Sequence, residues 1–386
     1  MKKILGITGI RSDYDLMSSL YKLLAKTSDV DFKLLVGGAH LSKTYGHSID
    51  LIQNDGIPIL ISVESLIDGD SPSSRIKTAS IMLQNVIDCV VSWSPDIIVY
   101  AGDREEVWIG ALLGTYLGVP TVHFYGGDHT TTGHVDNPVR HATSKLSSAH
   151  FVAIEEHKSR LMAMGEDNRR IFVTGNLSLD NFVVPSGVSF VDLKKKIGLP
   201  SNIGDYAIVL FHPDPSETES SARCMENILN CLSEKGLFAC VGYPNTDPAN
   251  REIIRVIEHF SDKPDVFIYQ NLDRNDFIAL YKNARFIIGN SSSGILEAAS
   301  IPLPAINVGV RQRGRLAGEN VVFCDGDKNS IFSAIELVES IEFREALKFL
   351  KNLYGDGQSA KIALDILLSM DFNALRLKTE DPLKLL

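Results

Sequence analysis

Residues 4–13 read Ile-Leu-Gly-Ile-Thr-Gly-Ile-Arg-Ser-Asp, and this stretch decides the fold class. Its first part, Ile4–Thr8, is a short apolar run that leads directly into a glycine and then into charged side chains. A helix-like pattern follows over residues 15–26. An apolar run of this length before a helix is typical of a strand in a parallel sheet that is buried on both faces. We therefore expect residues 4–8 to form the first buried strand of an α/β fold.

The same alternation of apolar runs and helix-like stretches continues along the chain. The further runs are 32–36, 97–101, 121–125, 151–154 and 171–174 in the first half, and 207–211, 238–242, 266–269, 286–288, 305–308 and 321–324 in the second half. Strands that alternate with helices form βαβ units and parallel sheets. The stretch 178–204 contains prolines, glycines and a lysine run, and we interpret it as a linker.

This pattern predicts two doubly wound, Rossmann-like α/β domains that face a cleft. We place the first domain at residues 1–180, the second at 181–370, and a C-terminal tail at 371–386. In such folds ligands bind beyond the carboxyl ends of the strands. We therefore expect the ligand in the cleft between the two domains.

Length, composition and charge narrow the possible functions. The chain has 386 residues, of which 44% are hydrophobic and 22% charged, which is enough for two or three domains with their own cores. Its 38 Lys and Arg against 48 Asp and Glu give a net charge of −10. Binding to nucleic acid or to an anionic membrane surface needs a basic face. We therefore expect neither as a partner.

The cysteines and the N-terminus indicate the compartment. The five cysteines are an odd number and contain no CxxC, which argues against a disulfide framework and a zinc ribbon. Met1-Lys2-Lys3 and the apolar run after it resemble a signal peptide, but the run is short and no cleavage site follows. No stretch approaches the length of a membrane span. We expect a cytoplasmic protein.

Polar residues follow four successive apolar runs of the first half. Each run ends in glycine and then an ionisable residue, at Gly9–Asp13, Gly37–His40, Gly102–Glu105 and Gly126–Asp128. Glycine allows a tight turn and a close approach of a ligand to the backbone. Because the carboxyl ends of parallel strands meet at one edge of a sheet, this convergence predicts a site there.

Each of these polar residues also has a structural interpretation. Asp103, taken alone, is better explained as the N-cap of the next helix than as a catalyst. His40 fits a turn or core histidine equally well. His123 lies inside an apolar run, where a buried structural imidazole and a catalytic one are equally good explanations. The four polar strand ends together favour a functional site over these structural interpretations.

The second half offers an imidazole at a strand end and an anion-binding loop. Phe211-His212-Pro213 closes one apolar run, and the Gly/Ser loop 289–297 follows another and opens a helix. Free N–H groups at such a loop cradle anions, although a serine N-cap explains the same pattern. The segment 309–315 holds three arginines in five residues, which indicates either a cluster that binds an anion or a solvated loop. Because GxGxxG, HExxH and metal-spaced His/Cys clusters are absent from the sequence, we expect no nicotinamide or other cofactor and no metal.

Taken together, these motifs resemble the UDP-N-acetylglucosamine 2-epimerases, in particular the hydrolysing branch of sialic- and legionaminic-acid-type synthesis. The resemblance covers residues 3–370 and rests on the segments 8–14, 38–42, 102–105, 123–128, 136–145, 211–213, 289–297 and 309–315. It implies a glycosyltransferase-B-like fold, a UDP-linked 2-acetamido sugar as substrate and a homodimer.

The resemblance also implies roles for individual residues. On the nucleotide side it assigns the diphosphate to Arg11, His212, Ser291 and Ser292, the ribose to Glu297, and further substrate contacts to Arg104, Asn245 and Arg311. On the sugar side it assigns an acidic catalytic trio, Asp103, Asp128 and Asp136, with His40 and His123 in support. The sequence departs from the family at Asp128, where relatives have Glu, at Tyr125, where they have His or Glu, and in a slightly longer stretch 128–140.

The implied reaction removes the C2 proton of the sugar, eliminates UDP and hydrates the resulting glycal, which gives a free manno-configured sugar and UDP. Clustered carboxylates shift one another's pKa values, so one can act as acid and another as base. The sequence leaves open which is which, and whether the sugar is UDP-N-acetylglucosamine or UDP-2,4-diacetamido-2,4,6-trideoxyglucose. The alternatives are a non-hydrolysing epimerase, a glycosyltransferase, and an inactive nucleotide-sugar binder on the same fold.

Overall fold

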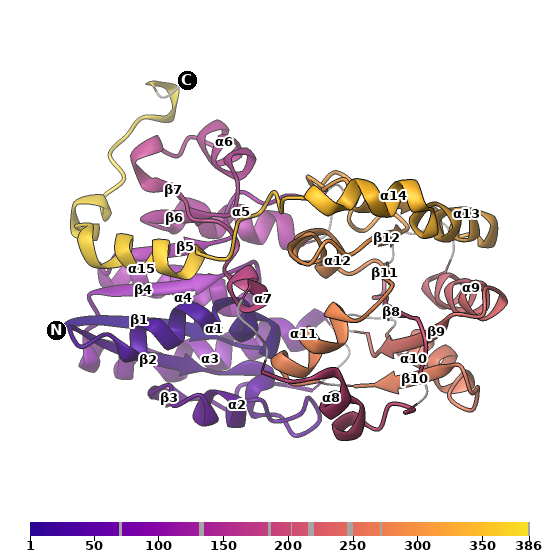
Figure 1. The fold of residues 1–386 in the computed structure, drawn as a ribbon. Helices are drawn as coiled ribbons and strands as arrows, with labels where there is room; N and C mark the ends of the chain where they lie inside the picture. The colour runs from indigo at the N-terminus through magenta and orange to yellow at the C-terminus, as the bar shows by residue number, and fades with distance from the viewer. Residues whose placement is uncertain are drawn as a thin grey trace. The chain divides into compact units, whose positions relative to one another are not determined.

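The computed structural model describes residues 1–68, 72–130, 135–183, 187–201, 203–214, 220–244, 250–270 and 272–384. These residues form two compact units, each built around its own parallel sheet (Figure 1). Unit 1 contains the described residues up to Asp128, those from Val135 to Asn181 and those from Gly357 onward. Unit 2 contains the described residues between Phe182 and Asp356.

The sheet of unit 1 has seven parallel strands in the order β3-β2-β1-β4-β5-β6-β7. Their bounds are β1 Lys2–Thr8, β2 Val30–Val36, β3 Ile59–Ser62, β4 Ile97–Ala101, β5 Thr121–Phe124, β6 Ala149–Val152 and β7 Ile171–Val173. The expected first strand is confirmed: Ile4 and Leu5 are fully buried and belong to core clusters that contain alternate residues of the strand. The strand order reverses between β1 and β4, as in a Rossmann fold.

Helices connect these strands. Their bounds are α1 Arg11–Lys26, η1 Gly38–Leu41, α2 Ile49–Asn54, α3 Pro72–Trp93, α4 Glu105–Leu117, α5 Asp136–Leu146, α6 Glu155–Ala163, η2 Asn168–Arg170, η3 Leu177–Leu179 and α7 Asp180–Val183. In α1 the buried residues recur at helical spacing, at Tyr14, Met17, Tyr21 and Leu24, which gives the helix one apolar face.

Unit 2 repeats the same strand order with six strands, β10-β9-β8-β11-β12-β13, all parallel. Its strands are β8 Tyr206–Leu210, β9 Phe238–Gly242, β10 Val266–Tyr269, β11 Phe286–Gly289, β12 Ala305–Val308 and β13 Val321–Cys324. Its helices are α8 Phe190–Ile197, α9 Ser221–Glu234, α10 Asn250–His259, α11 Arg274–Lys282, α12 Ser293–Leu296, η4 Ala298–Ser300, α13 Lys328–Glu339, α14 Ile341–Ala346 and η5 Leu347–Phe349. The prediction of two Rossmann-like units is therefore confirmed.

The course of the C-terminal segment differs from the prediction. We expected 357–370 in the second domain and 371–386 as a tail, but the chain returns to unit 1 at Gly357. Helix α15 (Ser359–Ser369) lies alongside α1 in Figure 1, and η6 (Phe372–Leu375) and η7 (Pro382–Lys384) follow it. The cause is an apolar face of α15, because Ala360, Ala363, Leu364 and Leu367 recur at helical spacing and are buried in the core of unit 1.

The expected linker also contains structure. Helix α8 begins after Ser189, whose hydroxyl caps the helix by accepting from the Asp192 N–H at 3.1 Å. The lysine run 194–196 forms the last turn of α8, where cations are favourable. The boundary between the two units, at Asn181 and Phe182, falls within the predicted linker, but residues 190–197 form a helix of unit 2.

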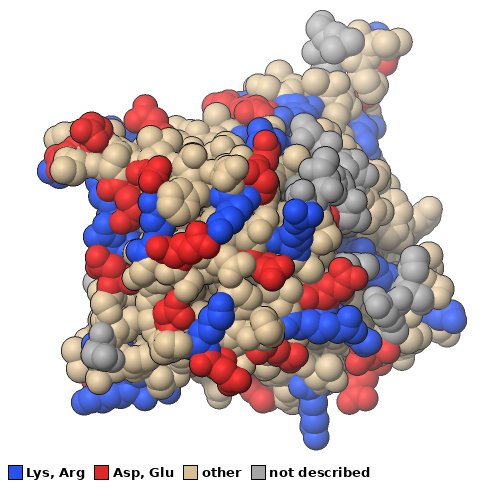
Figure 2. Space-filling view, turned by 90° about the vertical axis from the view of Figure 1, so that its right-hand side faces the viewer, with Lys and Arg blue, Asp and Glu red and all other residues tan. Residues whose placement is uncertain are grey.

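The surface carries both signs of charge. On the face drawn in Figure 2, Lys and Arg side chains alternate with Asp and Glu side chains. Ion pairs between opposite charges also occur in unit 2, for example Lys235–Glu336 at 2.8 Å. In the part of the chain that the structure describes, no helix combines the length and the apolar character that crossing a membrane requires.

Candidate functional site

The predicted strand ends of unit 1 lie along one edge of the sheet. Strands β2, β1, β4 and β5 are neighbours in this order, so the segments that follow them are adjacent. The Ala39 N–H donates to the Gly9 carbonyl at 2.8 Å, and the Gly102 N–H donates to the Phe124 carbonyl at 3.1 Å. Gly102 has φ +94°, a left-handed conformation that favours glycine.

An acidic cluster surrounds Arg140 on α5. The guanidinium pairs with the Asp103 carboxylate, and its Nη1 donates to the Asp128 carbonyl at 3.1 Å. The Arg140 side chain is only 5% exposed. The Asp128 Oδ1 lies 3.5 Å from His157 Nε2. Asp136 is the first residue of the same helix, one turn before Arg140, so α5 brings the predicted trio of aspartates to one region of unit 1.

His123 connects β5 to the end of β4 and to α5. Its Nε2 lies 2.8 Å from the Gly102 carbonyl, and its Nδ1 lies 3.0 Å from the Ser144 hydroxyl. Because a carbonyl only accepts, the proton is on Nε2 and Ser144 donates to Nδ1. Burial lowers the pKa of His123 to about 3, so the ring is neutral. A Cβ on Gly126 would lie 2.9 Å from the Ser144 hydroxyl oxygen, which explains the glycine there.

His40 is held in a similar way. It is fully buried, with Nε2 at 2.9 Å from the Thr8 hydroxyl and Nδ1 at 2.8 Å from the Ser48 hydroxyl. Burial lowers the pKa of His40 to about 4. Both ring nitrogens of His40 and of His123 are therefore engaged, and this favours the structural interpretation of the two histidines over a proton-transfer role.

The turn at residues 125–128, which contains Tyr125 and Asp128, has a constrained backbone. Tyr125 has φ +64°, which is unusual for a side chain other than glycine. Its hydroxyl donates to Asn176 Oδ1 at 3.1 Å, and the same oxygen accepts from the Ser178 N–H at 3.0 Å. A Cβ on Gly127 would lie 2.3 Å from the His157 carbonyl oxygen. The turn is thus fixed by contacts on both sides of Gly126.

The sequence analysis gave no individual role to two carboxylates at the same edge, the buried Glu106 and the partly buried Asp13. Glu106 is 3% exposed, and a Cβ on Gly9 would lie 2.2 Å from its carboxyl carbon. Burial raises the pKa of Asp13 to about 8, and burial also raises the pKa of Glu106. Arg104 Nε lies 3.6 Å from Glu106 Oε2. Asp13 belongs to the quoted segment 8–14, whereas Glu106 directly follows the quoted segment 102–105. The packing of Glu106 beneath Gly9 becomes visible only in three dimensions.

The remaining predicted residue of unit 1 is Arg11. It is the first residue of α1, and its Nε lies 3.5 Å from Asp15 Oδ2 one turn later. Arg11 therefore sits directly after the end of β1, at the same sheet edge as the segments above.

In unit 2 the strand ends meet at Asn290, which sequence analysis did not single out. The Asn290 side chain is fully buried and bonds twice to the His212 backbone, accepting from its N–H at 2.7 Å and donating to its carbonyl at 2.8 Å. Gly289 has φ +141°, and a Cβ there would lie 1.9 Å from the Leu210 carbonyl oxygen. Burial and the nearby Arg311 lower the pKa of His212 to about 3.

The serine loop and one of the three arginines lie at Asn290. Arg311 Nη1 donates to the Asn290 carbonyl at 3.4 Å, and Gln312 donates to it at 3.1 Å. Ser291 and Ser292 follow in the chain, and Ser291 accepts from the Ser293 N–H at 3.3 Å. The other two arginines bond elsewhere: Arg313 pairs with Asp325, and Arg315 donates to the Gln312 side chain.

Glu297 is held by residues from two helices. Its carboxylate accepts from Arg274 Nη2 at 2.9 Å and from the Ser293 hydroxyl. The Ser293 hydroxyl also lies 3.0 Å from the Tyr281 hydroxyl. Arg274 and Tyr281 belong to α11, which no motif linked to the loop, so the sequence carried no signal for them.

The predicted contact Asn245 lies outside the described residues. Among the described residues, no group of three or more His, Cys, Asp or Glu side chains could hold a metal ion.

The repeated strand order and the glycine-rich strand ends define a two-domain Rossmann-like α/β protein, a class that binds nucleotides at the carboxyl ends of its strands. The chain matches the model of the family described as UDP-N-acetylglucosamine 2-epimerase over residues 22–368, and it belongs to this family.

Two relatives and one solved structure show how broad this likeness is. The chain is 33% identical to the UDP-N,N'-diacetylbacillosamine 2-epimerase (hydrolyzing) of Legionella pneumophila, over 95% of this chain and 96% of that protein. It is 30% identical to a UDP-N-acetylglucosamine 2-epimerase of Neisseria meningitidis, over 90% of each. The crystal structure of a Neisseria meningitidis UDP-GlcNAc 2-epimerase bound to UDP-GlcNAc has a TM-score of 0.81 at 18% identity and covers 95% of this chain and all of that one.

Proposed function

We propose that the protein is a hydrolysing 2-epimerase, which converts a UDP-linked 2-acetamido sugar of the gluco type to the free 2-acetamido sugar of the manno type and UDP. The observation that supports this proposal is the surroundings of Arg140 in unit 1. Arg140 pairs with the Asp103 carboxylate and donates to the Asp128 carbonyl, and Asp136 is the first residue of the helix that carries Arg140. The relative at 33% identity bears the name of a hydrolysing enzyme, which supports the same reaction.

The nucleotide is assigned to unit 2. His212, Ser291, Ser292 and Arg311 lie around Asn290 and would bind the diphosphate. Because His212 is neutral, its ring contributes a hydrogen bond while Arg311 supplies positive charge. Glu297, fixed by Arg274 and Ser293, would accept from the ribose hydroxyls. Charge that develops on the departing UDP is stabilised by such preorganised donors.

The sugar is assigned to unit 1. The C2 proton is removed while the C1–O bond to UDP breaks, and water then adds to C1 of the glycal as C2 is protonated from the opposite face. The Arg140 guanidinium holds the Asp103 carboxylate in place, and Asp103 would accept the C2 proton. Asp128 and Asp136 would supply the remaining proton transfers. Arg11 and Arg104, beside these groups, would contact the phosphate closest to the sugar.

The identity of the sugar depends on the turn at residues 125–128. Asp128 is one methylene shorter than the family's usual Glu, and Tyr125 is anchored through Asn176. The shorter side chain leaves room for a second acetamido group. This favours UDP-2,4-diacetamido-2,4,6-trideoxyglucose over UDP-N-acetylglucosamine, and the product would feed synthesis of legionaminic- or sialic-type acids.

The test is to offer both UDP-sugars separately and to identify the products by NMR. Free manno-type sugar with one UDP released for each sugar supports the proposal, and Asp103→Asn serves as the inactive control. A mixture of UDP-linked epimers indicates a non-hydrolysing epimerase. The absence of UDP release without an added acceptor indicates a glycosyltransferase or an inactive binder.

We also propose that the protein works as a homodimer in the cytoplasm. Apolar side chains are exposed on neighbouring helices of unit 1, among them Ile76 and Val91 on α3 and Tyr116 on α4. The five free cysteines suit a reducing compartment. Light scattering of the purified protein should give twice the mass of one chain, and the mass of a single chain would contradict the dimer.

A further inference from the structure

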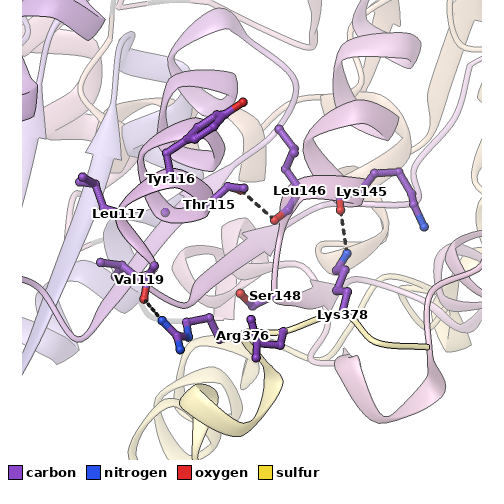
Figure 3. Close-up of a pocket in the computed structure, with 12 residues that line it drawn as sticks. Thr115, Tyr116, Leu117, Val119, Lys145, Leu146, Ser148, Arg376 and Lys378 are labelled. Atoms are coloured by element: carbon purple, nitrogen blue, oxygen red, sulfur yellow. Dashed lines mark hydrogen bonds between the residues drawn. The ribbon is translucent and has the colours of Figure 1, made fainter. Parts of the chain in front are cut away.

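The C-terminal segment caps the last turn of α5 with a lysine. Lys378 Nζ donates to the carbonyls of Ser144 at 3.1 Å and of Lys145 at 3.0 Å, and it pairs with Glu166 at 2.6 Å. Figure 3 shows Lys378 beside the Lys145 carbonyl at the end of α5. The ends of α4 and α5 and residues 376–378 line a cavity of about 520 Å³ there. A cation at the carboxyl end of a helix satisfies carbonyls that have no partner within the helix.

Buried charges fix this segment from both sides. Glu166, whose side chain is 1% exposed, accepts from His150 at 3.0 Å and from Lys378, and its other oxygen forms an ion pair with Lys145 at 2.7 Å. Burial alone would raise the pKa of Glu166, yet these bonds hold it at about 2. Burial lowers the pKa of Lys378 to about 8, so the ammonium keeps all three of its donors at pH 7.

Arg170 holds the same segment at its other side. It is 2% exposed, donates to the carbonyls of Leu375 and Leu377, and pairs with Glu380 at 2.8 Å. We name residues 375–380 the C-terminal clasp. A buried ion pair of this kind is costly to break, because the remaining charge would be buried without a partner.

Two short routes lead from the clasp to the acidic cluster. Ser144, whose carbonyl accepts from Lys378, uses its hydroxyl for the bond to His123, and His123 in turn bonds to the Gly102 carbonyl, one residue before Asp103. Ser144 also lies one turn after Arg140, whose guanidinium pairs with Asp103. Two chains of contacts therefore connect the clasp to Asp103, one through His123 and Gly102 and one through α5.

We propose that the C-terminal clasp positions the acidic cluster for the reaction, and that Lys378 is a positioning residue which acts through Ser144 and α5. The kinetic readout of this inference rests on the proposed function. Removing Lys378 takes the ammonium donor away from the Lys145 carbonyl. The Ser144 carbonyl would keep only its bond from the Ser147 N–H, and Glu166 Oε2 would keep only its bond to His150. The helix that carries Asp136 and Arg140 then loses its fixed position, and small displacements of catalytic groups reduce rates strongly.

The test compares Lys378→Met, which keeps length but removes the donors, with Lys378→Arg, which keeps charge and donors. Lys361→Met is the matched control, because Lys361 lies on α15 and makes an exposed ion pair with Asp365 at 2.6 Å. Turnover at pH 7 is divided by the number of UDP-binding sites, which calorimetry measures. Protein that has unfolded and cannot bind UDP therefore does not lower the calculated kcat. For Lys378→Met we expect kcat per UDP-binding site to fall by about tenfold with UDP affinity unchanged. Lys378→Arg should restore most of it, and the control should match the wild type.

Wild-type turnover per UDP-binding site in Lys378→Met would overturn the inference, even if that variant melts at a lower temperature. Should the wild type fail to act on either UDP-sugar, the proposed function fails, and the clasp is then tested by deuterium exchange. Amides at residues 143–147 should exchange faster in Lys378→Met than in the wild type and in Lys361→Met. Equal exchange in the three proteins would likewise overturn the inference.

Discussion

Asp128 has two possible roles, as an acid or base of the reaction or as a residue that only shapes the turn, and a substitution distinguishes them. If it transfers a proton, Asp128→Asn should lower kcat by about 10²–10⁴-fold, the usual scale for losing such a group. UDP affinity should stay at the wild-type value, because the nucleotide is assigned to unit 2. Steady-state kinetics and UDP titration measure the two quantities. Full activity in Asp128→Asn would leave the proton transfers to Asp103 and Asp136.

The same position tests the choice of sugar. Asp128→Glu restores the family's longer side chain, which should fill the space proposed for the second acetamido group. We expect kcat/KM to rise for UDP-N-acetylglucosamine and to fall for the 2,4-diacetamido sugar. A fall for UDP-N-acetylglucosamine would instead indicate that the wild type already prefers the simpler sugar.

On the nucleotide side, Arg311 and Arg313 form a matched pair within one loop. Arg311 reaches the Asn290 carbonyl, whereas Arg313 pairs with Asp325 and bonds to the Gly309 carbonyl. Arg311→Ala should weaken UDP binding by about 10- to 100-fold, which corresponds to about 1.5–3 kcal/mol for a charge-assisted hydrogen bond. Arg313→Ala should leave the calorimetric Kd near the wild-type value. Equal losses in both variants would argue for a general effect of charge.

At the scale of secondary-structure elements, β4, β5 and α5 meet at His123, and this junction makes unit 1 sensitive to pH. The folded protein keeps His123 neutral down to about pH 3, whereas the unfolded chain binds the proton below its ordinary pKa of about 6.5. The unfolding free energy should therefore fall as the pH falls through this window, by about 1.4 kcal/mol per pH unit for this group. Asp13, whose pKa is raised to about 8, changes the unfolding free energy with pH in the opposite direction. This contribution is the same in every variant compared, so it cancels in the comparison.

The comparison of His123→Gln with the wild type isolates this contribution. Between about pH 4.5 and 6, the slope of the unfolding free energy against pH should be smaller in His123→Gln by about 1.4 kcal/mol per pH unit. Trp93 and Trp108 are the two tryptophans of the chain and both belong to unit 1, so tryptophan fluorescence follows its unfolding. An unchanged slope in His123→Gln would contradict the buried neutral ring.

The elements themselves differ in how much of them the sequence could predict. Continuous apolar runs such as Ile97–Ala101 mark central strands, because both faces of the strand are buried. The strand β3 was missed, because it lies at the edge of the sheet, where three of its four residues are partly buried and Ser62 is exposed. The apolar spacing in α15 shows that one face is buried, but spacing alone does not say which sheet receives that face.

At the scale of the whole molecule, the polar strand ends were predictable and their pairings were not. The order of the apolar runs, together with the rule for parallel sheets, is enough to place Asp103 and Asp128 at one edge. The Arg140–Asp103 pair joins residues 37 positions apart, and the Lys378–Glu166 pair joins residues 212 positions apart. Local sequence patterns cannot predict such pairs, because the pairs depend on which helices pack over which strand ends.

The central claim is that both bonds of the proposed reaction, C1–O and C2–H, are broken on this protein, and proton NMR of the reaction in D₂O tests it most directly. We predict that the free manno-configured sugar accumulates with deuterium at C2 while UDP appears in equal amount, because C2 is protonated from solvent after UDP has left. Asp103→Asn should give neither signal. A UDP-linked sugar that gains deuterium at C2 without releasing UDP, or a free sugar that keeps its C2 proton and gluco configuration, would contradict the account.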